Sequence, residues 1–340
     1  MADAAMRAAR LYGASDVRVD EVAVPTAGPG EALVRVRAVS ICPSDWRLYV
    51  DGHAGGKEPE WPFVQGHEFA GDVVALGSDV AGPAPGTRVA VEPSWPCGSC
   101  DMCREGKHHI CRHVRFASFP PHGGALAQYV VVPHDALFPL PDALDYVAGA
   151  LSEPLCVALH ATRLAQLRPG ESVVLLGAGV IGVSTLQMAL AEGVGPTAVI
   201  EPVAERCALP QELGAAQVFA SLNEATAAGV EADVVFECSG DIPALDQCIR
   251  LARPGGRIVV IGIPRCEEIT FDIATARRHE LTITFSRRSF GMVEEGLALL
   301  ASGALRLRDL PLQRFALDQT TEAMEMTGRP GRNLRAVVEP

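Results

Sequence analysis

The sequence predicts an α/β protein of two domains, a β-rich domain followed by a doubly wound parallel sheet. Three observations carry this prediction. A chain of 340 residues, 48% of them apolar, exceeds the size that one hydrophobic core usually serves. Up to about residue 150, short alternating segments lie between glycine and proline turns. After residue 152, strand and helix patterns alternate as they do in βαβ units.

Residues 33–39 carry the clearest strand pattern of the first domain. Apolar side chains occupy alternate positions and arginines lie between them, after a glycine-proline turn at residues 28–30. Further short strands are predicted at residues 73–74, 88–91 and 129–132, again between glycines and prolines. Short strands of this kind predict a small barrel.

The alternation of the second domain begins with a helix at residues 155–166 and a buried strand at 172–176. It continues with helices at 180–192, 203–213 and 242–251 and strands at 198–201, 233–237 and 257–261. A helix at 293–302 and strands at 314–317 and 335–338 then depart from this rhythm. We therefore predict domains over residues 1–152 and 153–288, with residues 289–340 returning to the first.

Charge and hydropathy exclude several classes of partner. A net charge of −12 repels phosphate backbones and anionic membranes, and basic residues form no long run. No apolar run approaches the ~20 residues of a membrane helix, and the first ten residues lack a signal-peptide core. We expect a cytoplasmic protein that binds neither nucleic acid nor membrane. Five scattered cysteines suit buried, reduced thiols: Cys156, Cys207, Cys238, Cys248 and Cys266.

Four further cysteines lie close together in the spacing C-x2-C-x2-C-x7-C. They are Cys97, Cys100, Cys103 and Cys111. Four thiolates can close a tetrahedron around one Zn²⁺ and leave no position open. The lobe at residues 97–111 therefore predicts a structural zinc site rather than the reaction centre.

A second set of metal-ligand types lies outside this lobe. Cys42 follows the alternating strand, and His67 and Glu68 follow a glycine. Taken singly, each residue also suits a purely structural role: Cys42 as a thiol in the core, His67 as a hydrogen-bonded imidazole, and Glu68 as an acid on the surface. Together they form a mixed set that leaves one tetrahedral position for water or substrate. Glu153 is expected at a helix start, where the dipole favours a carboxylate and Pro154 suits the first turn; facing the metal, directly or through water, is compatible with that role.

A dinucleotide fingerprint follows in the second domain as Gly177-Ala178-Gly179-Val180-Ile181-Gly182. A buried strand leads into it and an apolar helix leaves it, a geometry that points backbone N–H groups at a pyrophosphate. The alternative is a glycine turn that serves helix packing alone. Glu201, at the end of the next strand, is expected to bind the adenosine ribose hydroxyls and to favour NAD over NADP. Arg206 either lies along the adenosine or is a solvated helix residue.

The order of these motifs resembles the zinc-dependent medium-chain dehydrogenases over essentially the whole chain. The resemblance is closest to the polyol branch, which includes sorbitol (L-iditol) and threonine dehydrogenases. It implies a GroES-like catalytic domain built from both ends of the chain, a Rossmann NAD-binding domain, two zinc ions per chain and a homodimer or homotetramer. It implies Cys42 and His67 as catalytic zinc ligands, with Glu68 as a ligand or exchanging neighbour. Glu153 takes the last protein position, where alcohol dehydrogenases proper place a cysteine.

The resemblance also implies a proton path. Ser44 matches the hydroxyl that passes the alcohol proton onward, but Arg47 stands where many relatives have a histidine. Arginine cannot be deprotonated at working pH, so we expect the path to end on solvent or on a histidine such as His53. Pro43 likewise replaces a glycine of many relatives.

The expected activity is hydride transfer between a secondary alcohol of a polyol, cyclitol or sugar and NAD, with zinc lowering the pKa of the alcohol. Arg287 and Arg288 fall near where relatives contact substrate or a neighbouring subunit, or form an exposed basic pair. Three alternatives stay open: a threonine-type amino-alcohol dehydrogenase, a zinc-independent enone reductase, and a catalytically silent scaffold that binds zinc and nucleotide.

Overall fold

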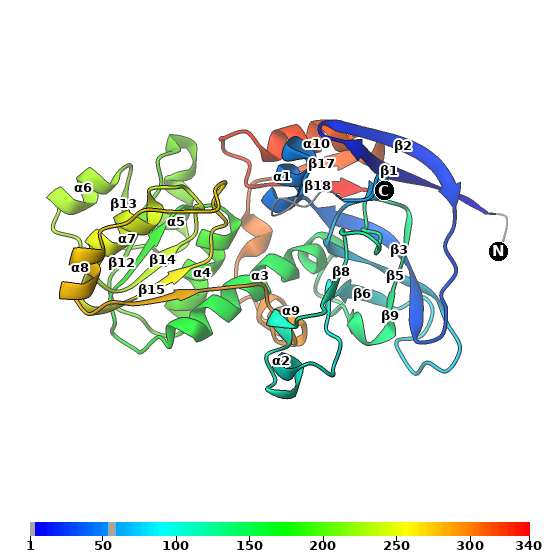
Figure 1. Ribbon diagram of the computed structural model, residues 1–340, viewed down its shortest axis with the longest axis horizontal. Helices are drawn as coiled ribbons and strands as arrows, with labels where there is room; N and C mark the ends of the chain where they lie inside the picture. Colours follow the sequence, from blue (N-terminus) through cyan, green and yellow to red (C-terminus); the bar gives the residue numbers. More distant parts are fainter. Residues whose placement is uncertain (1–3, 54–58) are drawn as a thin grey trace. The chain divides into compact units, whose positions relative to one another are not determined.

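The computed structural model describes residues 4–53 and 59–340 and divides into two compact units (Figure 1). Unit 1 comprises the chain up to Glu153 together with Ser289–Ser302 and Leu307–Pro340. Unit 2 comprises Pro154–Arg288 and Gly303–Arg306. Among the described residues, no helix has both the length and the apolar character needed to cross a membrane.

Unit 1 is rich in short strands. Its strands are β1 (Ala5–Gly13), β2 (Asp16–Ala23), β3 (Glu31–Ser40), β4 (Phe63–Val64), β5 (Glu68–Leu76), β6 (Arg88–Val91), β7 (Ser94–Trp95), β8 (Arg115–Phe116), β9 (Tyr129–Pro133), β10 (Leu137–Pro139), β17 (Leu312–Ala316) and β18 (Arg335–Glu339). Its helices are α1 (Pro43–Asp51), α2 (Asp101–Arg104), α9 (Val293–Ala301) and α10 (Thr320–Thr327), with short 3-10 turns η1 (His108–Ile110), η2 (His134–Ala136), η4 (Leu307–Asp309) and η5 (Leu317–Gln319).

The main sheet of unit 1 joins the two ends of the chain. Its strand order is β10-β6-β5-β3-β18-β17, and β9 also pairs with β3 (Figure 1). The C-terminal strand β18 lies antiparallel to β3, with Val338 opposite Val39. A second sheet has the order β2-β1-β4, and β7 pairs with β8. The strand predicted at residues 33–39 is confirmed, because Val34 and Val36 are buried in β3 while Arg35 is exposed.

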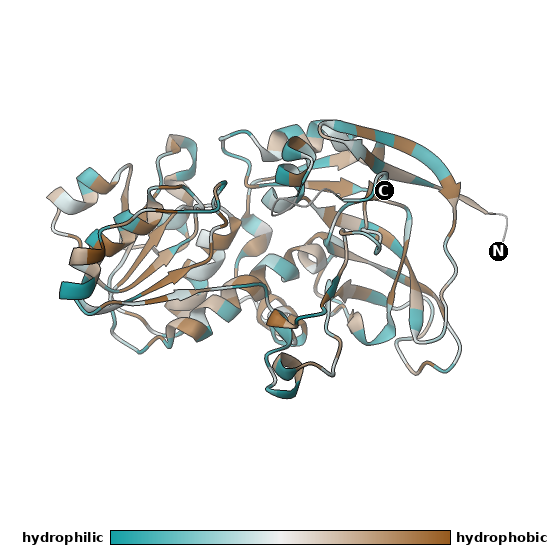
Figure 2. Ribbon diagram, viewed as in Figure 1, coloured by the Kyte–Doolittle hydropathy of each residue, from teal (hydrophilic) through white to brown (hydrophobic). Residues whose placement is uncertain are grey.

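Unit 2 is a six-stranded parallel sheet of order β13-β12-β11-β14-β15-β16. Its strands are β11 (Val173–Leu176), β12 (Thr197–Ile200), β13 (Gln217–Phe219), β14 (Ala232–Glu237), β15 (Ala252–Val260) and β16 (Thr282–Phe285). Its helices are α4 (Val180–Ala191), α5 (Ala208–Glu212), α6 (Leu222–Ala227), α7 (Ala244–Leu251) and α8 (Ile273–Arg278), with the 3-10 turn η3 (Ala204–Arg206). Figure 2 shows the strands as mostly hydrophobic, as expected for a parallel sheet buried on both faces. This order confirms the predicted doubly wound fold.

Two predicted helices differ from those observed. Helix α3 (Tyr146–Ala165) begins well before the predicted residue 155, because Asp145 accepts a hydrogen bond from the backbone N–H of Ala148 at 2.8 Å and ends the loop there. The helix predicted over residues 203–213 is instead η3 followed by α5. Pro210 has no N–H to donate to the preceding turn, so one continuous helix is disfavoured.

Candidate active site

The pairing of β3 with β5 brings the first three predicted metal ligands together in unit 1. The register places Ser40, the last residue of β3, opposite Glu68, the first residue of β5. Cys42 follows two residues later as the N-cap of α1, and His67 immediately precedes β5. The ligand atoms of Cys42, His67 and Glu68 consequently lie within 4.8 Å of one another. A thiolate, an imidazole and a carboxylate at this spacing form a three-residue metal set.

A carboxylate behind His67 orients its ring. Asp45 Oδ1 lies 3.3 Å from His67 Nδ1, an ion-pair contact without the geometry of a hydrogen bond, which leaves Nε2 as the nitrogen available to a metal. Burial disfavours the protonated imidazole, but the Asp45 carboxylate outweighs burial and raises the pKa of His67 well above its ordinary value. Burial likewise opposes ionisation of Asp45, but the His67 charge and several hydrogen bonds lower the pKa of its carboxyl. Each partner of this buried pair therefore favours the charged form of the other: Asp45 as a carboxylate and His67 as a protonated imidazole.

The donor set fits zinc. Glu68 Oε2 is buried and has no hydrogen-bond partner among the described residues, as expected of an atom meant for a metal. Glu68 Oε1 accepts a hydrogen bond from Arg335 Nη2 at 3.1 Å. The mixed sulfur, nitrogen and oxygen donors match the ligand types of an open zinc site.

Glu153 lies beside this set rather than within it. Burial, followed by the charge of Glu68, raises the pKa of Glu153 to about 7, so its carboxyl lies close enough to interact with Glu68 and His67. The predicted position at a helix start is wrong: Glu153 and Pro154 lie inside α3. The helix dipole therefore does not account for a carboxylate at this position, since its effect is confined to the first turn.

Several residues around the site were not identified from the sequence. Arg335 is 3% exposed and contacts Glu68 from the far end of the chain; an arginine within the apolar run of β18 is the signal that marks it. Glu92 follows β6, and burial together with the Glu153 charge raises the pKa of its carboxyl to about 8. Glu92 Oε2 accepts a hydrogen bond from the backbone N–H of Gly291 at 3.2 Å.

The four-cysteine lobe is also assembled in unit 1. The ligand atoms of all four cysteines lie within 4.8 Å of one another, and Cys100 Sγ is 3.8 Å from Cys111 Sγ. Backbone N–H groups point at the sulfurs: Cys97 donates to Cys111 Sγ at 3.3 Å, and Cys100 donates to Cys97 Sγ at 3.4 Å. Hydrogen bonds from the backbone and side chain of Ser99 lower the pKa of Cys97 to about 5. Burial raises the pKa of Cys103 to about 12, so it is the gathering of four sulfurs within reach of one ion that suits a closed zinc site.

In unit 2 the glycine motif forms the tight turn between β11 and α4. Gly177 has φ of 96°, and Gly179 is the N-cap of α4. A Cβ atom on Gly182 would lie 2.0 Å from the Gly177 carbonyl oxygen, so no larger residue fits there. Val180 and Ile181 are the first two residues of α4, so their N–H groups belong to the open N-terminal turn of this helix. This is the geometry of a pyrophosphate-binding turn.

The acidic residue expected at the ribose lies at the end of β12. Glu201 is 3% exposed, and its two carboxylate oxygens accept hydrogen bonds from the backbone N–H groups of Ala178 at 2.7 Å and Val203 at 2.8 Å. Glu201 is thereby held against the glycine turn. Arg206 is half-buried in η3 nearby in sequence. Glu237, at the end of β14, similarly accepts hydrogen bonds from the backbone of Ser239 and Gly240, and the sequence did not reveal this.

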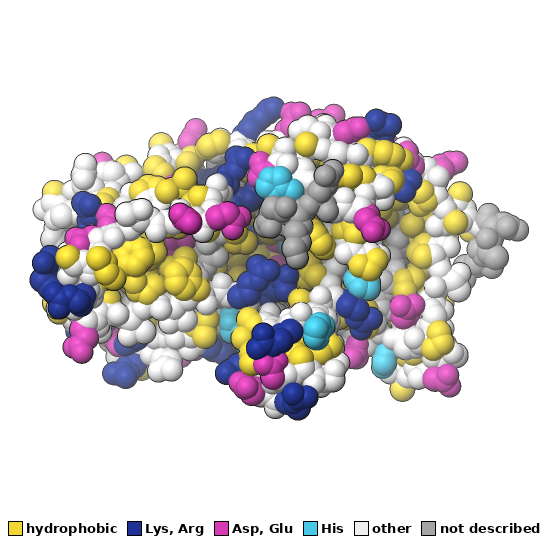
Figure 3. Space-filling view, viewed as in Figure 1, with side chains coloured by type: hydrophobic (Ala, Val, Ile, Leu, Met, Phe, Trp, Pro, Cys, Tyr) yellow, Lys and Arg dark blue, Asp and Glu magenta, His cyan; other side chains and the backbone are white. Residues whose placement is uncertain are grey.

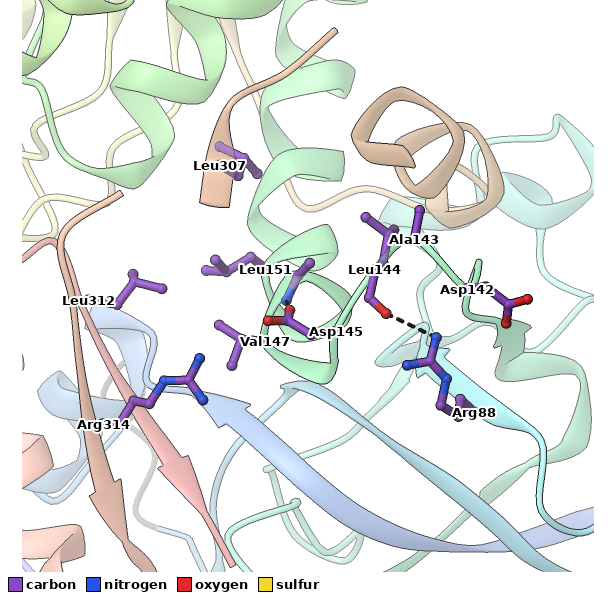
Figure 4. A pocket seen from close by; sticks show the side chains of 11 residues that line it. Arg88, Asp142, Ala143, Leu144, Asp145, Val147, Leu151, Leu307, Leu312 and Arg314 are labelled. Atoms are coloured by element: carbon purple, nitrogen blue, oxygen red, sulfur yellow. Dashed lines mark hydrogen bonds between the residues drawn. The ribbon is translucent and has the colours of Figure 1, made fainter. Parts of the chain in front are cut away.

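Unit 1 also has a cavity of about 340 Å³ away from the metal set, and Arg88, Leu151 and Arg314 are among the residues that line it (Figure 4). Its two arginines are already engaged: Arg88 Nη2 donates to the carbonyl oxygens of Pro141 and Leu144, and Arg314 pairs with Glu339 at 2.6 Å. None of the predicted site residues lines it. The chemistry therefore belongs to the metal set and not to this cavity.

Comparison with known proteins agrees with this geometry. Residues 28–142 match the alcohol dehydrogenase GroES-like domain, and residues 180–302 match the zinc-binding dehydrogenase domain. Sorbitol dehydrogenase of Bacillus subtilis is 32% identical over 327 residues, covering 94% of this chain and 93% of its own. L-idonate 5-dehydrogenase of Vitis vinifera is 31% identical over 345 residues, covering 97% and 93%.

A solved structure extends the likeness to the whole fold. The 2R,3R-butanediol dehydrogenase of Bacillus subtilis has a TM-score of 0.88 and 28% identity, covering 98% of this chain and 99% of its own. The GroES-like and Rossmann fold class predicted from the sequence is confirmed. With both family domains matched and full-length relatives above 30% identity, the chain belongs to the zinc-dependent medium-chain dehydrogenases, in their polyol branch.

Proposed function

We propose that this dehydrogenase oxidises a secondary alcohol of a polyol, cyclitol or sugar to the ketone with NAD, and catalyses the reverse reduction. The observation that carries the proposal is the mixed set of Cys42, His67 and Glu68, whose ligand atoms lie within 4.8 Å of one another. Relatives named for sorbitol and L-idonate support a polyhydroxylated substrate.

The roles of the side chains follow from their chemistry. Cys42, His67 and Glu68 would hold the zinc, and Glu153 would reach it directly or through water. Bound zinc lowers the pKa of an alcohol and polarises a ketone, while the nicotinamide exchanges hydride with the substrate. Asp45 keeps the His67 ring oriented. Ser44, half-buried on α1, would pass the alcohol proton outward, because Arg47 cannot accept it.

The decisive experiment follows NAD⁺ reduction at the nicotinamide absorbance across polyols, cyclitols, sugars and amino alcohols, with and without a chelator. We expect polyhydroxylated secondary alcohols to be the best substrates and the chelator to remove the activity. Preference for an amino alcohol such as threonine would contradict the substrate class. If the protein binds NAD⁺ but no alcohol in the panel reduces it, the proposal that the protein is an enzyme is wrong.

We infer that Glu201 selects NAD, because its carboxylate is held where the adenosine ribose is expected and would repel a 2′-phosphate. Replacing Glu201 with alanine is expected to lower kcat/KM for NAD relative to NADP by about 10–100-fold, the effect of one charged hydrogen bond. Glu205→Ala, an exposed acid in η3, is the matched control and should leave the ratio unchanged. An unchanged ratio in Glu201→Ala would remove this role.

We propose that the chain forms a homo-oligomer through β16. This strand is at the edge of the parallel sheet, and Phe285 at its end is 68% exposed beside Ile263, which is 54% exposed. Both line a cavity of about 410 Å³, and Figure 3 shows hydrophobic side chains gathered on this part of unit 2. Exposed apolar edge strands favour association.

Light scattering tests this association. Phe285→Asp is expected to reduce the mass from that of a dimer or tetramer, whereas Ile273→Asp, an equally exposed isoleucine on α8, should not. A monomeric wild-type protein would disprove the proposal. The cytoplasm is the compartment that we propose, since none of the ten cysteines, all of them in the described part of the chain, forms a disulfide; cell fractionation tests this.

A further inference from the structure

Ser118 combines burial with a backbone conformation that side chains rarely adopt. Its φ is 79°, in the left-handed region, and the residue is 5% exposed. Such a conformation costs conformational energy in a residue with a Cβ atom, and glycine would relieve it. A strained buried residue persists only where its surroundings require it, and such residues cluster at functional sites.

The strain places the Ser118 hydroxyl between two segments of the metal set. Ser118 Oγ donates to Asp45 Oδ1 at 3.0 Å and accepts from the backbone N–H of Gly66 at 2.9 Å. Both hydrogen bonds are buried. Asp45 lies three residues after the ligand Cys42, and Gly66 immediately precedes the ligand His67. One hydroxyl therefore joins the two chain segments that deliver the sulfur and the imidazole.

The two oxygens of Asp45 have separate partners. Oδ1, which accepts from Ser118, is also the atom 3.3 Å from His67 Nδ1, whereas Oδ2 accepts from the backbone N–H of Cys42 at 3.2 Å. Without Ser118, Asp45 Oδ1 loses its hydrogen-bond donor, and the Cys42 N–H at Oδ2 is left to hold the carboxylate beside the imidazole. Phe116, two residues before Ser118, packs on the His67 ring with centroids 5.1 Å apart. The same loop thus contacts the imidazole directly and through Asp45.

The Gly66 side of the bridge is equally constrained. Gly66 has φ of 97°, and a Cβ atom there would lie 2.9 Å from Val39 Cγ1 and 3.1 Å from Leu126 Cγ. The peptide preceding His67 therefore has little room to move. The buried N–H of Gly66 itself needs an acceptor, and Ser118 Oγ supplies it.

We propose that Ser118 is a positioning residue for the open zinc site: its left-handed backbone is kept because it aims the hydroxyl at Asp45 and Gly66, and so fixes His67 for metal binding. The inference rests on the proposed zinc ligands, and it assigns part of their hold on the metal to Ser118, which is not itself a ligand.

The experiment compares Ser118→Ala, which keeps the backbone strain and removes the hydroxyl, with Ser118→Gly, which removes both. Zinc release to a chelator is followed with a metal indicator, and the four-cysteine lobe serves as an internal reference in every sample. Ser15 is a second serine in the left-handed region, with φ of 57°, and lies in an exposed turn. Ser15→Ala and Ser15→Gly are therefore matched controls for the backbone effect.

We expect both Ser118 variants to release the open-site zinc about tenfold faster than the wild type, the low end of effects for residues behind a metal ligand. Release from the lobe should be unchanged, and thermal unfolding should show Ser118→Gly to be more stable than Ser118→Ala. The Ser15 variants should release zinc from both sites at the wild-type rate. Retained zinc in both Ser118 variants, equal acceleration at the two sites, or normal retention in Ser118→Gly alone would overturn the inference. A wild-type protein that holds only one zinc would instead contradict the proposed function.

Discussion

Replacing Cys42 with serine is expected to abolish turnover while the nicotinamide cofactor still binds. Cys42 supplies the sulfur of the open set, and a hydroxyl is a poor substitute for a thiolate as a zinc ligand. We expect kcat/KM to fall at least about a thousandfold, beyond the 10–100-fold losses typical of residues behind the ligands. The zinc content should fall from two ions per chain to one. Cofactor affinity should be unchanged, because the glycine turn lies in unit 2.

The measurements are steady-state kinetics, metal analysis and titration with NAD followed by protein fluorescence. Cys266→Ser, a half-buried thiol outside both cysteine sets, is the control and should retain activity and both zinc ions. Wild-type turnover in Cys42→Ser would remove zinc from the mechanism. Loss of NAD binding together with turnover would show general misfolding, which thermal unfolding would confirm, and the ligand assignment would then depend on His67→Ala.

Replacing Cys100 with alanine is expected to destabilise the protein rather than to impair its chemistry. The main apolar core of unit 1 includes no residue of the lobe, and only Cys103 and Cys111 of its four sulfur residues are buried, so we expect its structure to depend on the metal. We expect a loss of about 3–5 kcal/mol in the free energy of unfolding, at the upper end for single substitutions. At about 2–4 °C per kcal/mol, Tm should fall by more than about 6 °C.

Thermal unfolding with and without a strong chelator measures this effect. Once the chelator has removed the lobe zinc, the wild type and Cys100→Ala should unfold at similar temperatures, because both then lack the same metal. The folded fraction of Cys100→Ala should retain most of its kcat at low temperature. A variant with an unchanged Tm and no activity would contradict the structural assignment of the lobe.

The sequence alone determined the features that depend on neighbouring residues. Four cysteines spaced C-x2-C-x2-C-x7-C can reach one metal without help from the rest of the chain, and the structure gathers their sulfurs within 4.8 Å. The Gly177-to-Gly182 turn is equally local, since its glycines are required by contacts within the turn itself. Cys42, His67 and Glu68 were identified because they are metal-ligand residue types that precede the cysteine lobe and the glycine motif. The register of β3 with β5 then brings them together in space.

Tertiary structure decided the environment of those ligands. Arg335 meets Glu68 across 267 residues because β18 pairs with β3, and Ser118 meets Asp45 across 73 residues because a strained loop crosses the site. Glu153 lies inside α3 because Asp145 starts that helix earlier than Pro154 suggests. Burial raises the pKa of Glu153 and leaves the Arg335–Glu68 and Ser118–Asp45 hydrogen bonds without competition from water. Short-range patterns specify which atoms can bind a metal, but only the packing of distant segments holds those atoms in place.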